Sequence, residues 1–95
     1  MKKQKKYKID EAMNNLNLPR YKAAIRIIPQ MLGIAFNTFH NYRKMTIDNK
    51  ADIPYEMVRK MEMIFKLKEG ELPNYKIDCR DLDTLMNEED PDKTA

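Results

Sequence analysis

The chain contains few of the residues from which enzyme and metal sites are built. It has one cysteine, Cys79, one histidine, His40, and only two glycines among 95 residues. A lone cysteine cannot form a disulfide within the chain, and neither Cys79 nor His40 has a second ligand at metal-binding spacing. Two glycines leave little capacity for a phosphate-binding loop, and no nucleophile lies near a base. The sequence therefore predicts no enzyme, no bound metal and no cofactor.

Long apolar runs are missing as well. The N-terminal KKQKKYK has the charge that begins a signal peptide, but the polar segment IDEAMNNLNL follows it in place of an apolar stretch. No segment is apolar for long enough to span a membrane. Together with the unpaired Cys79, this predicts a cytoplasmic protein with no membrane partner and no evident small-molecule ligand.

Charge is distributed unevenly along the chain. Residues 1–68 carry 15 Lys and Arg against 6 Asp and Glu, whereas residues 69–95 carry 3 against 9. A small basic body attracts polyanions, so nucleic acid is the first partner to consider, although any single lysine can simply solvate a helix. The acidic tail either lies over the basic face and weakens non-specific binding or keeps the chain soluble, and we favour the second interpretation.

Apolar residues recur at helical spacing, which predicts an all-α chain with one compact domain. We expect a flexible basic arm at residues 1–8 and the domain at 9–72. A C-terminal extension at 73–86 can form one short helix through its leucines, and a disordered acidic tail follows at 87–95.

Two prolines and a glycine divide the domain into helices. Ile9 begins a short helix that ends near Asn17, and Pro19 suits the first turn of the next. Pro29 removes an amide donor inside that second helix, so we expect a break or kink there. Gly33 supplies a sharp turn, and Phe36–Lys44 forms another helix whose apolar side holds Phe36, Phe39 and Tyr42.

A later helix opens at Pro54 and has the most regular apolar stripe of the chain. Leu72 is then available to pack back on the core. The residues predicted for the stripe are Met57, Val58, Met61, Ile64 and Phe65, with Met63 outside it.

The spacing of Ile25–Lys44, two short helices joined by a turn at residues 33–35, is typical of a helix-turn-helix. With the later segment IPYEMVRKMEMIFKLKEGEL, it resembles the Cro/C1-type, lambda-repressor-like family over about Tyr21–Leu72. Gly33 matches the turn glycine of that family, Leu32 and Ile34 its buried neighbours, and Phe39 and Tyr42 the inner face of its recognition helix. The resemblance implies a small bundle of about five helices and DNA binding as a homodimer.

Three residues depart from the family pattern at the motif itself. Pro29 stands where a small residue is usual, and Ala35, in place of serine or threonine, cannot cap the following helix unless Asn37 or Thr38 substitutes. Phe36 stands where a polar residue usually faces DNA. We expect it to contact a thymine methyl, to pack under the N-terminal arm or to meet a partner chain.

These features predict a sequence-specific double-stranded DNA-binding protein, a small transcriptional regulator of bacterial or phage type, whose helix 36–44 enters the major groove. The base-contacting residues expected are Asn37, Thr38, His40 and Asn41. The phosphate-contacting residues expected are Tyr21, Lys22, Arg43, Lys44 and Lys50. The arm lysines expected along the DNA backbone or a minor groove are Lys2, Lys3, Lys5, Lys6 and Lys8. The alternative is a protein-interaction module, of antitoxin or adaptor type, on the same fold.

Overall fold

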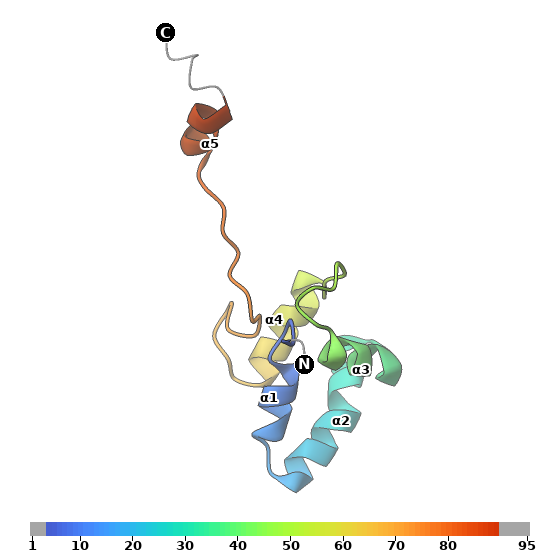
Figure 1. The fold of residues 1–95 in the computed structure, drawn as a ribbon. Helices are drawn as coiled ribbons and strands as arrows, with labels where there is room; N and C mark the ends of the chain where they lie inside the picture. The colour runs from blue at the N-terminus through green and yellow to red at the C-terminus, as the bar shows by residue number, and fades with distance from the viewer. Residues whose placement is uncertain (1–3, 90–95) are drawn as a thin grey trace.

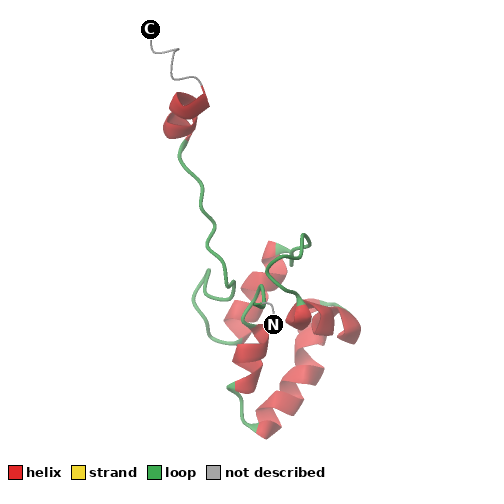
Figure 2. Cartoon of the chain, in the orientation of Figure 1, coloured by secondary structure: helices red, strands yellow, loops and turns green. Residues whose placement is uncertain are grey.

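A computed structural model describes residues 4–89 of the chain as helices joined by loops, with no β-strand in that range (Figures 1 and 2). The all-α prediction is confirmed. Helices α1 to α4 form one body, in which α2 packs against each of the other three and α1 also packs against α3. The helices, in chain order, are α1 (Ile9–Asn14), α2 (Leu18–Leu32), α3 (Phe36–Lys44), α4 (Tyr55–Ile64) and α5 (Leu82–Glu89).

The core lies where α1, α2, α3 and α4 meet, and it is closed by residues from the loops and from the N-terminal segment. Phe39 from α3 and Met61 from α4 are completely buried in it, as is Leu72, which packs back after α4 as predicted. The buried apolar side chains are Tyr7, Ile9, Met13, Ile28, Leu32, Phe39, Met45, Ile53, Val58, Met61 and Leu72.

Helix α2 runs without a break through Pro29, so of the break or kink that we expected the break is wrong and the kink stays a prediction. Its start is capped by Asn17, whose side-chain oxygen accepts a 3.0 Å hydrogen bond from the Arg20 amide. Pro29 removes one backbone hydrogen bond, but it is buried, as are the core residues Ile28 and Leu32 of the same helix. Burial of this apolar face holds the helix together across the missing bond.

Helix α4 follows Pro54 directly, as predicted, and buries Val58 and Met61. Met63 lies outside the stripe, with 68% of its side chain exposed. Ile64, which we expected in the stripe, is 38% exposed because the last turn of α4 borders an open groove rather than the core.

The N-terminal segment is packed on the body, so the prediction of a flexible arm at residues 1–8 is wrong for residues 4–8. The Lys6 amide donates to the Met45 carbonyl and the Lys8 amide to the Leu72 carbonyl, each at 2.8 Å. Tyr7 is 2% exposed and anchors the segment in the core, a role that the lysines around it in the sequence do not indicate. Lys2 and Lys3 lie outside the described residues.

Helix α5 extends the predicted C-terminal helix to Glu89, so the expected disorder from Asn87 is wrong for residues 87–89. Asp81 caps this helix through a 3.0 Å hydrogen bond from the Thr84 amide, and the Thr84 side chain and amide lower the pKa of Asp81. Within the described residues, α5 contacts none of the other helices and stands apart at the end of an extended segment (Figure 1). It does not lie over the basic face.

Glu62 on α4 is a completely buried carboxylate that helical spacing did not reveal. One oxygen accepts from Arg59 Nη1 and the other from the Leu72 amide, both at 2.9 Å. Burial raises the pKa of Glu62. The hydrogen bonds from the Leu72 amide, Arg59 and the Gly70 amide lower the pKa by more than burial raises it, so the net shift is downward. Glu62 thereby fastens the loop after α4 and seats Leu72 in the core.

We predict that Glu62→Gln lowers the free energy of unfolding by about 1–3 kcal/mol, since a neutral amide cannot accept both bonds as a carboxylate does. The exposed Glu56→Gln on the same helix should change it by less than about 0.5 kcal/mol. Because the folded pKa of Glu62 is lowered, its contribution is full above the unfolded value of about 4.3 and is lost as the pH falls through the folded value. Urea unfolding at stepped pH measures both effects, and equal stability of the two variants would contradict the assignment.

Candidate nucleic-acid interface

The turn between α2 and α3 has the geometry that Gly33 predicts. Gly33 follows α2 with φ 68° and ψ 34°, in the left-handed region that glycine adopts without steric cost. Its amide donates to the Gln30 carbonyl at 3.1 Å, and the Ile34 amide donates to the Pro29 carbonyl at 3.0 Å. This pair of bonds closes the end of α2, and half-buried Ile34 then packs against the core. Helix α3 begins at Phe36, so its predicted bounds are confirmed.

The first turn of α3 has no side-chain cap. Ala35 is extended, with φ −70° and ψ 154°, and offers no oxygen, as expected for alanine. Neither Asn37 nor Thr38 supplies a substitute among the described contacts. The first amides of α3 are therefore open to an external acceptor.

The outer face of α3 carries polar side chains that the rest of the body does not use. Asn37, Asn41 and Lys44 are exposed, while Thr38 and His40 are half-buried. None of the five makes a side-chain hydrogen bond or ion pair with another residue in the range 4–89. The four predicted base-contacting residues thus lie on one short helix with Lys44, and all five side chains face or border solvent.

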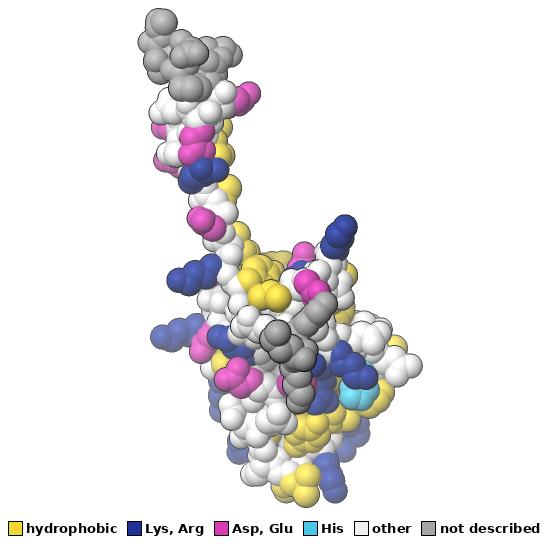
Figure 3. All heavy atoms as spheres, viewed as in Figure 1, with side chains coloured by type: hydrophobic (Ala, Val, Ile, Leu, Met, Phe, Trp, Pro, Cys, Tyr) yellow, Lys and Arg dark blue, Asp and Glu magenta, His cyan; other side chains and the backbone are white. Residues whose placement is uncertain are grey.

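Phe36 does not belong to the apolar side of α3, contrary to our prediction. It is 48% exposed, whereas Phe39 is completely buried and Tyr42 is half-buried. The Phe36 ring meets the His40 ring edge-on, with centroids 4.8 Å apart. These residues are one helical turn apart, so they share a face, and Figure 3 shows the imidazole at the surface beside basic and apolar side chains.

We predicted that Arg43 contacts phosphates, but its side chain is bound inside the body instead. Its Nε donates to Asp10 at 2.7 Å and its Nη2 donates to the Tyr21 hydroxyl at 2.9 Å, with only 11% of the side chain exposed. The guanidinium also lies 5.6 Å from the Tyr21 ring centroid and 6.0 Å from that of Phe39. Burial lowers the pKa of Arg43, but Asp10 and Tyr21 raise it more. Arg43 and Tyr21 therefore join α1, α2 and α3 internally.

Lys6, in the N-terminal segment, is likewise committed to the body. Lys6 Nζ pairs with Asp52 at 2.5 Å and donates to the Asn49 and Ala51 carbonyls. Lys5 lies 3.8 Å from Asp10, and Lys8 is half-buried. A backbone-tracking arm is therefore wrong for Lys6, because its ammonium closes the loop before α4 and is no longer at the surface.

Exposed cations remain on either side of the turn. Lys22 and Lys50, which we expect to contact phosphates, are exposed, and Arg26 is exposed on α2 one turn after Lys22. Arg26 is not among the contact residues predicted from the sequence, although its position four residues after Lys22 places it on the same side of the helix. No acidic residue occurs between Glu11 and Asp48, so α2, the turn and α3 carry no carboxylate that would repel a polyanion.

The described part of the chain has neither a membrane-spanning helix nor a cluster of metal ligands. No helix within residues 4–89 has the length and apolarity needed to cross a membrane. In the same range, His, Cys, Asp and Glu side chains do not gather into a group that could hold a metal ion. No family model, curated protein or solved structure matches this chain.

We predict that Arg43→Ala lowers the free energy of unfolding by about 1–3 kcal/mol, because Asp10 and Tyr21 lose their shared partner. The neighbouring Lys44→Ala should change it by less than about 0.5 kcal/mol, since Lys44 is exposed. Chemical denaturation of the two variants makes the comparison. Equal stabilities would mean that the Arg43 contacts contribute nothing to the fold.

Proposed function

We propose that the chain is a sequence-specific double-stranded DNA-binding protein of the small transcriptional-regulator type, in which α2 and α3 act as a helix-turn-helix. The observation that carries this proposal is the outer face of α3, where Asn37, Asn41 and Lys44 are exposed and have no side-chain hydrogen bond or ion pair within residues 4–89. An α-helix fits the major groove of B-DNA, and asparagine can pair bidentately with adenine there. The same face would have no evident use in a body that served only as a scaffold.

The surroundings of α3 suit a phosphate backbone. Lys22, Arg26 and Lys50 are exposed cations, and the uncapped backbone amides at the start of α3 can also donate hydrogen bonds to a phosphate oxygen. In this arrangement Arg43 is a positioning residue, because it fixes the last turn of α3 against α1 without touching DNA. Asn37 and Asn41 are one turn apart, so they would contact nearby base pairs.

A protein-interaction module on the same fold is the second candidate, and exposed Phe36 is the observation that favours it. An aromatic ring on the first turn of α3 can anchor a protein partner as readily as it can contact a thymine methyl. The two candidates differ in their dependence on salt, because only binding to a polyanion releases a large number of condensed counterions.

We predict that fluorescence anisotropy with a random-sequence duplex detects binding at low salt. A protein that contacts about 4–6 phosphates should lose affinity by about 10²–10³-fold between about 50 and 200 mM salt. A polyanion-independent partner would show a far smaller change. Absence of any binding at about 50 mM salt with tens of micromolar protein would contradict the DNA proposal, because non-specific binding alone should then be visible.

We further predict different effects of Asn41→Ala and Lys44→Ala on a site recovered by selection from random duplexes. Asn41→Ala should relax preference at one base pair by about 1–3 kcal/mol, whereas Lys44→Ala should weaken binding to all sequences alike. Binding titrations against a panel of single-base variants separate the two patterns. Matching patterns would refute the division into base and phosphate contacts.

A further inference from the structure

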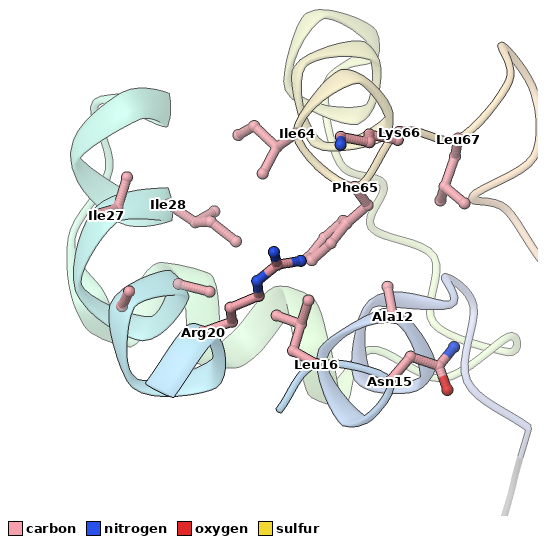
Figure 4. Close-up of a pocket in the computed structure, with 12 residues that line it drawn as sticks. Ala12, Asn15, Leu16, Arg20, Ile27, Ile28, Ile64, Phe65, Lys66 and Leu67 are labelled. Atoms are coloured by element: carbon pink, nitrogen blue, oxygen red, sulfur yellow. The ribbon is translucent and has the colours of Figure 1, made fainter. Parts of the chain in front are cut away.

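An apolar groove of about 440 Å³ opens between α1, α2 and the residues that follow α4 (Figure 4). Leu16, Ile28 and Phe65 converge on its centre, and Ile27 and Ile64 border it with 42% and 38% of their surface exposed. Its volume is in the range of sites that hold a ligand or an inserted side-chain cluster. The groove is thus an apolar surface that the body leaves uncovered.

The rim of the groove is basic. Arg20 extends across it toward Phe65, and Lys66 lies at its edge (Figure 4). Both side chains belong to exposed residues, and neither has an ion-pair partner among residues 4–89. A partner that suits this groove therefore combines apolar side chains with negative charge.

Helix α5 has that combination. Leu82, Leu85 and Met86 recur at three- and four-residue steps, so they share one face, and all three are exposed. Residues 81–89 also carry four carboxylates and no basic residue: Glu88 is paired with Arg80, whereas Asp81, Asp83 and Glu89 have no ion-pair partner among residues 4–89. Because Asp81 caps the helix, α5 presents this face already formed.

We infer that α5 of one copy of the chain docks in the groove of a second copy, and that the exchange is reciprocal. Each copy then gives a helix and receives one, which produces a closed two-fold dimer with two equivalent contacts. Leu82, Leu85 and Met86 enter the groove, and the α5 carboxylates that Arg80 does not pair face Arg20 and Lys66. Two apolar surfaces that are both exposed in the single chain cover each other.

The path of the chain favours a second copy over the groove of the same chain. Before α5, the chain is held to the body at Tyr75, whose hydroxyl lies 3.4 Å from that of Tyr7 and which lines the same pocket as Tyr55 at the start of α4. The groove lies beyond the other end of α4, about 15 Å away for a ten-residue helix. Residues 76–81 span about 20 Å when extended and lead away from the body, so return to the same groove would require them to reverse direction (Figure 1).

This inference goes beyond DNA binding and does not rest on it. The docking surfaces include none of the residues assigned to DNA, so self-association is measured without DNA and fails or succeeds independently of the function proposed above. Sedimentation equilibrium of the full chain from micromolar to submillimolar concentration should show a monomer–dimer equilibrium.

Two substitutions test the two sides of the contact. Leu85→Glu on α5 and Ile27→Glu in the groove should each weaken dimerisation by at least about tenfold, because each places a charge in the apolar contact. Matched controls are Asn87→Glu, on another face of α5, and Met63→Glu, exposed on α4 outside the groove, and both should leave dimerisation within about twofold. Circular dichroism checks that each variant is folded. If Ile27→Glu does not fold, Ile64→Glu serves as a second groove variant.

A mixture of the two defective variants identifies helix-in-groove pairing specifically. The intact α5 of the Ile27→Glu chain can still enter the intact groove of the Leu85→Glu chain, so the mixture should associate more tightly than either variant alone. A monomer at every concentration would overturn the inference. The groove would then bind the chain's own α5 or another protein. Dimerisation that Ile27→Glu does not affect, or a mixture no tighter than its components, would overturn it as well.

Discussion

The position of α3 depends above all on Arg43, which joins three helices at one point. A nine-residue helix without an N-terminal cap is marginal by itself, so its orientation must come from tertiary contacts. Phe39 supplies the apolar contact, the Gly33 turn fixes the start, and Arg43 fixes the end through Asp10 at 2.7 Å and Tyr21 at 2.9 Å. A cation in the last turn also suits the negative end of the helix dipole. The outer face can remain unpartnered because this inner attachment is complete.

Features that depend on local backbone geometry were predictable from the sequence. Gly33 predicted the turn because a left-handed residue at a helix end favours glycine, and helical spacing then gave the bounds of α3 and its buried Phe39. Pro29 shows the limit of local reasoning. Its missing hydrogen bond favoured a break, but the burial of its ring in the core outweighed that bond, and burial depends on residues far away in the chain.

For the candidate site as well, residues placed by local helical spacing were predictable from the sequence, and residues placed by distant partners were not. Asn37, Asn41 and Lys44 were predictable because helical spacing alone turns them away from Phe39. The roles of Arg43 and Lys6 were not predictable, since their partners Asp10 and Asp52 lie 33 and 46 residues away in the sequence. In the sequence, a cation that binds a ligand cannot be distinguished from one that pairs inside the fold. Whether a basic residue serves a ligand or the fold therefore required the tertiary structure.

Helix α2 has two opposed faces, which separate the acidic C-terminal segment from the proposed DNA-binding face. Successive residues are turned by about 100° around a helix, so Lys22 and Arg26 point roughly opposite to the groove residues Ala24 and Ile27. An acidic α5 that docks in the groove would therefore lie behind the basic side of α2, where its carboxylates meet Arg20 rather than compete with phosphates. The opposed faces of one helix would keep the two charges of the chain apart, and the proposed dimer contact and the proposed DNA contact could be occupied together.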